Sequence, residues 1–415
     1  MKFNKSSQLF LVSRVFLIAM AGLLAATLLT SCEITTIDFV FVASSAGSGS
    51  SSAGQIQTFD VDSESGAIRT GQPTVPSGGS SPAAMAVSSN YQHLYVINQG
   101  NDSVVHFTIG AYAVLTKADS VNAGNTPVAL AVDTSGTYLY VLTGPEPAVL
   151  TVYSLSSSGA IGSITSQQTL SLSNVSSKYA EDVLVPTGVT VLANNNAVSG
   201  NGVFVTAYDQ NAYNPGGPVT STANPGWVFG YSIGSGGVLT PAANSPFEAG
   251  VKPSGIASDP TDRFVYVTDY ASNELIGYSI HDGSTLVFLI NGPFKTNNEP
   301  QALVIDPRGK YIYVANALSS SVASYSIDLA TGTPASNIGA SNSTDTEPVA
   351  IVVDAALGRF VYTANYLGNS ISGFKLDPNT GELTATQASP YPSGAQPTAV
   401  ASVPAGSHAV ETITP

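Results

Sequence analysis

Short runs of β-branched and aromatic residues recur along this chain, and turn-forming residues separate them. The unit between Pro253 and Pro300 shows the pattern most clearly. Its apolar runs, each bounded by turn residues such as Asp259-Pro260, are 255–258, 264–268, 275–280 and 286–290. Runs of this length and composition, bounded by Asp, Pro, Asn and Gly, predict four short β-strands in one unit.

The same unit recurs along the chain, and a proline marks the start of each copy. These prolines are Pro82, Pro127, Pro186, Pro253, Pro300, Pro348 and Pro397. A small-apolar run follows each proline, and a run rich in Tyr, Phe and Val comes next. Regularly spaced strands with no helical periodicity between them predict a β-propeller. The Ala-rich and Gly-rich first strand would line the central axis, and the second strand would be covered on both faces by neighbouring blades.

The two ends of the chain complete the count of blades. Residues 38–42 have the pattern of a second strand with no first strand before it, and residues 398–403 have the pattern of a first strand. Six full units and one shared unit predict an all-β, seven-bladed propeller over residues 38–415. Each blade would have four antiparallel strands, and the C-terminal strand would close the ring and remove its free edges. The Gly/Ser run 43–55 is expected to be a flexible loop, and residues 405–415 a frayed end.

Composition agrees with a turn-rich β protein. Of the 415 residues, 43% are hydrophobic and 10% are charged, with Gly 39 and Pro 25. All 27 acidic residues follow Cys32, whereas three of the 13 basic residues precede it. A chain that begins at Cys32 would therefore be strongly acidic. This argues against nucleic acid as a partner, because phosphate backbones are bound by clustered Lys and Arg.

The N-terminal segment has the form of an export signal. Lys2, Lys5 and Arg14 precede an apolar run over residues 15–30, which is shorter than the ~20 residues of a membrane-spanning helix. The run ends in the tetrapeptide 29–32, Leu-Thr-Ser-Cys, which resembles the bacterial lipobox. The resemblance implies a signal peptide over residues 1–31 and a lipid on Cys32.

The consequence would be a lipoprotein of the cell envelope, held at the membrane through Cys32. Glu33 after the cysteine favours the outer membrane over the inner one, and residues 32–37 would be the tether. An ordinary signal peptide with a chance cysteine is the alternative. Because Cys32 is the only cysteine, no intramolecular disulfide is expected.

Short motifs within the units carry a family resemblance. Gly-x-Leu-Thr (237–240), Ser-Pro-Phe (245–247), Gly-x-x-Pro (250–253), Asp-Pro (259–260) and Tyr-Val-x-Asp (266–269) occur in order. The first three recur at 381–384, at 389–391 with Tyr in place of Phe, and at 394–397. This pattern resembles the bacterial lactonase-type and YVTN-type propellers, which include 6-phosphogluconolactonase-like enzymes and a fungal muconate cycloisomerase. The resemblance implies the propeller fold and, as one activity, hydrolysis of a lactone.

Strand direction places a set of polar residues at one end of the ring. The first strand of each blade leaves the end that bears the proline, and the second strand returns to it. We expect the following residues to gather at this channel mouth: Asn98, Thr143, Asp209, Lys252, Asp269, Glu299, Asn316, Glu347, Asn365 and Gln396. Four basic residues, Arg263, Arg308, Lys310 and Arg359, belong to the opposite end.

The mouth could hold the groups that lactone hydrolysis requires. A carboxylate would activate water, and Glu299, Glu347 or Asp269 could provide it. Lys252 could stabilise the oxyanion, and Asn98, Asn316 and Asn365 could bind the ligand. The alternative is that Asn and Asp at the strand ends only form turns, and that Glu before Pro is only solvated.

The histidines weaken the prediction of an enzyme. His93, His106, His281 and His408 all fall away from the predicted mouth, and the chain lacks the His-x-His and His-Pro motifs of the enzymatic relatives. No cofactor is expected. A divalent cation held by oxygen donors from Glu299, Glu347, Asp269 and Asn316 is an open alternative.

An insertion after the second strand of the fourth blade would emerge at the mouth. It carries Tyr208, Asp209 and Tyr213 and leads to Trp227, the only tryptophan. Aromatic faces stack on sugar rings, so these residues are candidates for binding. The alternative is that Trp227 starts the third strand and packs between blades.

Two functions follow from this sequence. The first is a monomeric, lipid-anchored binding or scaffold module whose partner is an envelope protein or a glycan. The second is a lactonase that acts on a sugar lactone or a related ring ester. Phosphorylated substrates are disfavoured, because Lys252 is the one clear cation expected at the mouth and the chain is acidic.

Overall fold

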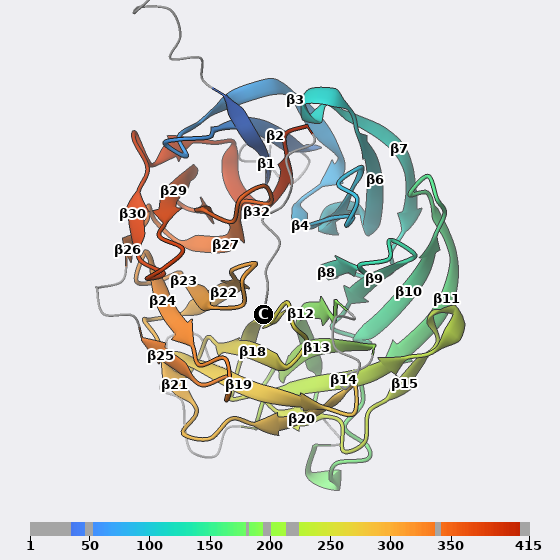
Figure 1. The fold of residues 1–415 in the computed structure, drawn as a ribbon. Coiled ribbons are helices and arrows are strands. Elements are labelled where there is room, and N and C mark those ends of the chain that lie inside the picture. The colour runs from blue at the N-terminus through green and yellow to red at the C-terminus, as the bar shows by residue number, and fades with distance from the viewer. Residues whose placement is uncertain are drawn as a thin grey trace, which may run out of the picture. The chain divides into compact units, whose positions relative to one another are not determined.

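A computed structural model describes residues 35–45, 53–179, 182–193, 201–212, 224–336 and 342–406. The chain separates into two units, Met1–Thr36 and Ile37–Pro415. The second unit is a ring of seven antiparallel sheets arranged around a central axis (Figure 1). This confirms the predicted all-β, seven-bladed propeller.

Blade 1 joins the two ends of the ring. It contains β1 (Thr36–Ser45), β2 (Ala53–Asp62), β3 (Ile68–Ser80) and the C-terminal strand β32 (Ala395–Pro404), in the order β3-β2-β1-β32. In this pair Asp38 lies opposite Pro404 and Val42 opposite Val400. The closing strand that the sequence predicted is therefore present, and the ring has no free edge at this junction.

The other six blades follow one another along the chain. Blade 2 contains β4 (Pro82–Val87), β5 (His93–Asn98), β6 (Ser103–Ile109) and β7 (Leu115–Asn122). Blade 3 contains β8 (Pro127–Val132), β9 (Tyr138–Thr143), β10 (Val149–Leu155) and β11 (Ile161–Thr169). Blade 4 contains β12 (Leu184–Val191), β13 (Gly202–Asp209), β14 (Trp227–Ile233), β15 (Leu239–Pro241) and β16 (Phe247–Glu248).

Blades 5 to 7 repeat this pattern closely. Blade 5 contains β17 (Pro253–Ser258), β18 (Phe264–Asp269), β19 (Glu274–His281), β20 (Thr285–Phe288) and β21 (Phe294–Lys295). Blade 6 contains β22 (Pro300–Ile305), β23 (Tyr311–Asn316), β24 (Ser321–Ile327), β25 (Pro334–Ser336) and β26 (Asn342–Ser343). Blade 7 contains β27 (Pro348–Val353), β28 (Phe360–Asn365), β29 (Ser370–Leu376), β30 (Leu383–Ala385) and β31 (Tyr391–Pro392). Four short 3₁₀ helices lie in the described connections: η1 (Gln99–Asn101), η2 (Ala111–Ala113), η3 (Ser177–Tyr179) and η4 (Ser235–Gly237).

Some strand limits differ from those that the sequence predicted. The fourth strand of blade 5 was expected over 286–290, but β20 ends at Phe288 and a separate segment, β21, pairs with the same neighbour β19. Strands β1 and β2 extend to Ser45 and from Ala53, so both ends of the predicted loop 43–55 are strand, and residues 46–52 lie outside the described ranges.

The core is divided among the junctions between blades. Among the described residues, the buried hydrophobic side chains form seven clusters, and each cluster joins two neighbouring blades. The second strands contribute most, because neighbouring blades cover both of their faces: Tyr266, Tyr313 and Tyr362 are all fully buried. Burying one such side chain contributes about 2–3 kcal/mol.

The same tyrosines also link neighbouring blades by hydrogen bonds. The hydroxyl of Tyr266 donates to the carbonyl of Gly332 at 2.7 Å, and that of Tyr313 donates to Gly381 at 3.0 Å. Gly332 has a φ of +74°, and a Cβ there would meet the ring of Phe264 at 2.3 Å. The glycine in this outer turn is therefore required both by its conformation and by the aromatic ring that it covers.

Candidate ligand site at the channel mouth

The end of the ring where the first strands begin, called the mouth face here, is built by one repeated backbone contact. The residue after the second strand donates its N–H to the carbonyl of the residue before the blade's proline. This bond joins Tyr270 to Lys252 at 2.9 Å and Tyr366 to Glu347 at 2.7 Å. The same backbone hydrogen bond thus places a different pair of side chains at the mouth face in each blade.

Five of the residues that precede the blade prolines have a left-handed backbone. Their φ values are +52° for Ser81, +46° for Thr126, +56° for Glu299, +59° for Glu347 and +51° for Gln396. A residue before proline ordinarily adopts an extended conformation, and a left-handed non-glycine residue costs of order 1–3 kcal/mol. The fold therefore holds these side chains, two of them glutamates, in an unfavourable conformation at one rim.

Lys252, Tyr270 and Glu299 form a contact chain between blades 5 and 6. The Tyr270 hydroxyl donates to Glu299 Oε2 at 2.6 Å, and Lys252 Nζ lies 4.0 Å from the centre of the Tyr270 ring. The ring of Tyr208 lies 5.5 Å from the same Nζ. Burial lowers the pKa of Lys252, and the charge of Glu299 opposes that shift. A cation, a carboxylate and a hydroxyl thus meet in one place.

Glu347 extends this group into blade 7. Burial raises its pKa, and the nearby negative charge of Glu299 raises it further. A glutamate with a raised pKa is a better general base near neutral pH than an ordinary surface glutamate. Two of the three predicted candidate bases, Glu299 and Glu347, therefore interact electrostatically.

A cavity of about 950 Å³ occupies the centre of the ring at this end. Backbone and small side chains of the first strands form most of its wall, in agreement with the prediction that these strands line the axis. Polar side chains from several blades also line it: Ser81, Gln99, Thr187, Tyr270, Gln301, Glu347, Tyr366 and Gln396. The cavity has the volume of a small-molecule site and offers hydrogen-bond donors and acceptors together with aromatic rings.

Other predicted mouth residues are used in the turns themselves. Asp269 is fully buried and accepts hydrogen bonds from the N–H groups of Val251 and Lys252, both at 2.9 Å. The remaining predicted carboxylate base therefore fixes the loop that carries Lys252, and its side chain does not face the cavity.

The three asparagines at the ends of second strands are also buried. Asn98 bonds Ser77, Asn316 bonds Thr296 and a backbone carbonyl, and Asn365 bonds Thr363, Ser370 and Ser372. Each of the three has no exposed surface. Their amides are used in contacts within the protein: Asn98 bonds a residue of β3 in blade 1, and Asn365 bonds residues of its own hairpin. Thr143 is buried as well.

The residues predicted in the insertion of blade 4 separate into different environments. Trp227 is the first residue of β14, is 2% exposed, and packs edge-on against Tyr179 with ring centres 5.3 Å apart. It lies in the core between blades 3 and 4. Asp209 is buried and accepts a hydrogen bond from Asn224 at 2.9 Å, whereas Tyr208 lies beside Lys252. Tyr213 lies outside the described residues.

Two histidines form a buried hydrogen-bonded chain away from the mouth. His93 Nδ1 lies 3.0 Å from His106 Nε2, and His106 Nδ1 lies 2.9 Å from Asp119 Oδ2. The chain lies in blade 2 beside the outer turn of blade 3, where Gly159 covers the ring of His93. His408 lies outside the described residues.

Tyr270, Tyr366 and Gln301 belong to the site but were missed by the sequence prediction. The available signal was positional: Tyr270 and Tyr366 immediately follow second strands, and Gln301 immediately follows a blade proline. The sequence prediction chose the polar residue at the end of the second strand, which is buried, and not the tyrosine that follows it.

The divalent cation that was left open would have used Glu299, Glu347, Asp269 and Asn316. Asp269 and Asn316 are buried in separate turns. Within the described ranges, no group of three or more His, Cys, Asp or Glu side chains is arranged to hold a metal ion.

Among the residues that the structure describes, no helix has the length and hydropathy needed to cross a membrane. Cys32 and the predicted signal peptide lie outside them.

The fold and the cavity define a class of protein, a seven-bladed propeller with a polar cavity at one end of its axis. A family model described as "Lactonase, 7-bladed beta-propeller" matches residues 41–181 and 237–353. These ranges include more than half of the chain, and the protein belongs to this family.

Solved structures share the fold at low sequence identity. The periplasmic gluconolactonase of Pseudomonas aeruginosa is 17% identical with a TM-score of 0.65, and the match covers 89% of this chain and 99% of that chain. A candidate 6-phosphogluconolactonase from Bacteroides uniformis is 16% identical with a TM-score of 0.67, covering 89% of this chain and 100% of that one. A protein from Lactobacillus plantarum is 15% identical with a TM-score of 0.68, and the match covers 88% of this chain and 99% of that chain. No curated protein sequence matches significantly.

Proposed function

We propose that this protein is an envelope module, anchored through a lipid on Cys32, whose channel mouth binds a small polyhydroxylated ring of the sugar or sugar-lactone class. The observation that carries this proposal is the set of side chains around one cavity: Glu347, Gln301 and Gln396 for hydroxyl groups, and Tyr270 and Tyr366 for the ring. Amides and carboxylates bind hydroxyls, and aromatic faces cover the apolar side of sugars.

The proposed ligand carries no phosphate. Lys252 lies between two aromatic rings; burial lowers its pKa, and the negative charge of nearby Glu299 opposes that shift. A phosphoryl group would meet the negative charge of Glu299 and Glu347 at the same rim, where the cation Lys252 already lies near Glu299. A neutral ring avoids this repulsion.

Isothermal titration calorimetry with gluconolactone, glucose and short glycans tests the binding. Binding should weaken about 2- to 10-fold in Tyr270→Phe, which removes one hydroxyl, since a hydrogen bond contributes about 0.5–1.5 kcal/mol. Tyr325→Phe is a matched control, because Tyr325 lies in blade 6, is 3% exposed, and bonds a backbone carbonyl away from the cavity. Binding of an envelope protein with no binding of any small ring would replace this proposal with the scaffold alternative.

A second candidate is hydrolysis of the bound lactone, and the raised pKa of Glu347 favours it. Glu347 would take a proton from water as the water oxygen attacks the carbonyl carbon. The ring C–O bond would then break, and the ring oxygen would take up a proton to give the hydroxy acid. Lys252 and the Tyr270 hydroxyl are the nearby groups that could stabilise the oxyanion.

A pH-stat assay over a panel of lactones separates the two candidates. Acid release that is lost in Glu347→Gln would identify an enzyme. Ligand binding without acid release above the uncatalysed rate would leave the binding module as the function.

A further inference from the structure

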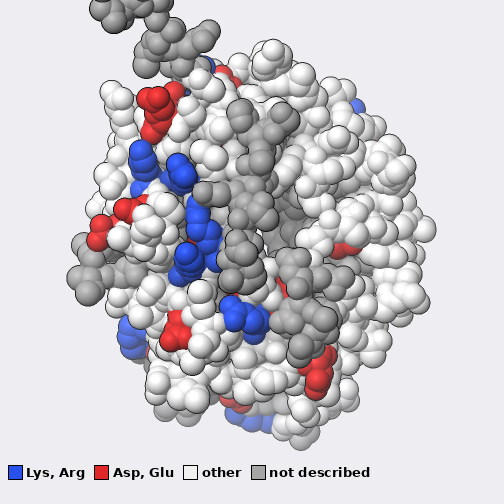
Figure 2. Space-filling view, in the orientation of Figure 1, with Lys and Arg blue, Asp and Glu red and all other residues white. Residues whose placement is uncertain are grey.

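Positive charge gathers on the end of the ring opposite the mouth, called the far face here. Only ten Lys and Arg residues follow Cys32. Five of them lie at turns or strand ends of blades 5 to 7 on this face and are called the basic band: Arg263, Arg308, Lys310, Arg359 and Lys375. Figure 2 shows a blue band crossing this side of a chain whose net charge is −14.

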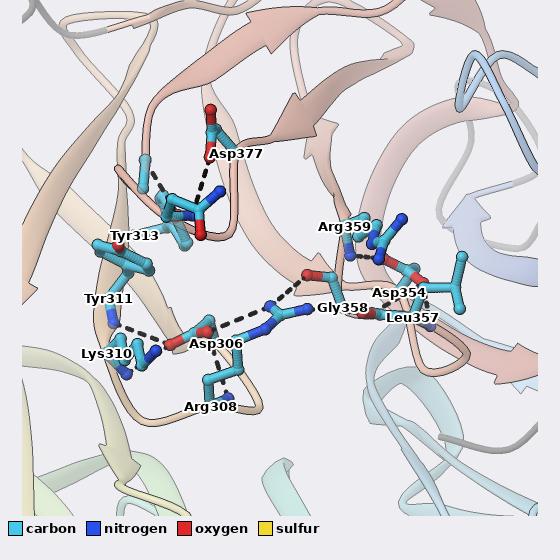
Figure 3. Close-up of polar contacts among 12 residues, drawn as sticks. Asp306, Arg308, Lys310, Tyr311, Tyr313, Asp354, Leu357, Gly358, Arg359 and Asp377 are labelled. Carbon is cyan, nitrogen blue, oxygen red and sulfur yellow. Dashed lines mark hydrogen bonds and ion pairs between the residues drawn. The ribbon is translucent and has the colours of Figure 1, made fainter. Parts of the chain in front are cut away.

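The carboxylates beneath the basic band are buried. Asp259, Asp306 and Asp354 are at most 2% exposed and accept backbone N–H groups within their own turns. Arg308 lies over Asp306 and donates to the carbonyls of Leu357 and Gly358 in the next blade, as Figure 3 shows for Gly358. Lys310, Arg359 and Lys375 are exposed to solvent. Exposed acids such as Asp328 and Asp377 lie on the outer turns, further from the axis.

The N-terminal strand begins on this same face. Strand β1 runs from the far face, where Asp38 lies opposite Pro404, to the mouth, where Ser45 lines the cavity. Asp38 accepts hydrogen bonds from Ala355 at 2.7 Å and Ala356 at 3.3 Å, in the turn that also carries Arg359. The start of β1 is therefore a neighbour of the basic band.

The length of chain before β1 limits the distance to a membrane anchor. Cys32 precedes Thr36 by four residues, which span at most about 14 Å at ~3.5 Å per residue. A lipid on Cys32 would hold the far face within about that distance of the membrane surface, comparable to the Debye length of ~8–10 Å. Charges on this face would then act directly on the headgroups.

We propose that the basic band docks on anionic lipid headgroups, so that the channel mouth points away from the membrane. The orientation rests on the proposed anchor at Cys32, whereas the attraction between the band and the lipid does not. Each basic side chain near an anionic surface raises partitioning by about fivefold, and the effect weakens with salt. Docking would leave the mouth open to ligands.

Vesicle co-sedimentation tests the attraction with a soluble chain of residues 33–415, which contains the whole ring and closes through β1 and β32. Vesicles of phosphatidylcholine with about 30% phosphatidylglycerol are compared with pure phosphatidylcholine. We expect binding only to the anionic vesicles, and about 25-fold weaker binding for Lys310→Gln/Arg359→Gln. The pair Lys178→Gln/Lys295→Gln removes the same charge from exposed residues in other parts of the chain and should bind as the parent does.

Three outcomes would overturn the docking: no binding to anionic vesicles, equal binding to both compositions, or equal loss in the two double variants. Circular dichroism of each variant shows that the ring is folded. Metabolic labelling with a radioactive fatty acid, in the parent and in Cys32→Ala, tests the anchor separately. Vesicle binding without fatty-acid labelling would support docking on lipid and contradict the anchor at Cys32. Labelling without vesicle binding would support the anchor and contradict the docking.

Discussion

The two ends of the same blades use different turn structures. On the far face, an aspartate between the first and second strands accepts the N–H groups that follow it: Asp306 bonds Lys310 and Tyr311 at 2.7 and 2.8 Å, and Asp259 and Asp354 do the same in their blades. On the mouth face, the residue before the proline is left-handed in five blades, and three of these residues, Ser81, Glu347 and Gln396, line the cavity. In blades 6 and 7 the far-face turn has a glycine, Gly309 or Gly358, at its left-handed position, whereas the mouth face has a glutamate, Glu299 or Glu347, and therefore carries the strain. Blade 5 differs, because Asp262 in its far-face turn has a φ of +57°. Strain of this kind is characteristic of functional sites.

The largest difference should appear when each turn loses its side chain. In Asp354→Ala, the N–H groups of Leu357, Arg359 and Phe360 lose their carboxylate acceptor, whereas that of Gly358 keeps the backbone carbonyl of residue 354. Each buried unsatisfied donor costs about 1–3 kcal/mol, and the removal of a buried carboxylate offsets part of the loss. We expect a decrease of about 3 kcal/mol in the free energy of unfolding, measured by urea denaturation with Trp227 fluorescence.

Asn365→Ala is the matched change on the mouth face. Its amide bonds side-chain hydroxyls of Ser370 and Ser372, which can rotate to other partners. The expected loss is about 1 kcal/mol. Equal losses in the two variants would mean that the two ends are stabilised alike, contrary to the comparison.

The turns of the far face were predictable from the sequence, whereas at the mouth the positions of Lys252, Glu299 and Glu347 were predictable but the backbone conformation was not. Asp-Pro turns have a local cause, because the aspartate and the N–H groups that it accepts lie within six residues. The left-handed residues before proline have no local cause, since isolated chains favour extended backbone there. Their conformation follows from pairing that brings Pro300 opposite Asn316 and Ala302 opposite Ala315, with an irregularity between them. Strand direction predicted Glu299 and Glu347 at the mouth, but the hydrogen bond from Tyr270 to Glu299 joins two blades, and spacing along one blade carries no signal for that contact.

A second test compares blade 2 with blades 5 and 7. The position of His93 is occupied by Phe264 and Phe360 in those blades, and the position of His106 by Gly277 and Gly373. The Asp119 carboxylate accepts, so His106 donates to it from Nδ1–H, and His106 Nε2 accepts a hydrogen bond from the Nδ1–H of His93. His106→Gly alone leaves His93 and Asp119 each without the hydrogen bond to His106, and should lower the free energy of unfolding by about 2 kcal/mol. His93→Phe/His106→Gly rebuilds the arrangement of the other blades and should recover most of that loss.

The histidine pair should also give blade 2 a pH dependence. Burial, together with the charge of His106, lowers the pKa of His93 below its ordinary value of 6.5. The unfolded chain therefore takes up the proton first, so stability falls as the pH is lowered from about 6.5 toward the folded pKa. Thermal unfolding between pH 7.5 and 5 should show a smaller decrease in the double variant than in the parent. The same decrease in both would exclude His93 as its origin.

The strain at the mouth can be measured as a smaller difference in stability between two variants of Glu347. Glu347→Gly and Glu347→Ala both remove the carboxylate, but only glycine adopts a φ of +59° without a steric cost. We expect the glycine variant to be about 1 kcal/mol more stable than the alanine variant, again by urea denaturation. The order should reverse at Gln301, which lies in strand β22 of the same rim. There the glycine variant should be less stable than the alanine variant by about 0.5–1 kcal/mol. Glycine below alanine at both positions would show that Glu347 carries no strain.

The most selective test changes one charge at the mouth. In Glu299→Gln the negative charge that raises the pKa of Glu347 disappears, while the effect of burial remains. Glu347 should therefore titrate at a lower pH than in the parent, yet still above its ordinary value of 4.5. An NMR titration of the Glu347 side-chain carboxyl carbon measures the shift directly. Glu274→Gln is the control, since Glu274 pairs with exposed Lys295 at 2.7 Å and its loss should leave the pKa of Glu347 unchanged.

The raised pKa of Glu347 also makes the free energy of unfolding fall as the pH rises from 4.5 to the pKa in the folded protein. Glu299→Gln should therefore flatten the pH dependence of unfolding in this interval. An unchanged titration would mean that the two glutamates do not act on each other, and the carboxylates of blades 6 and 7 would then be independent groups on a shared rim.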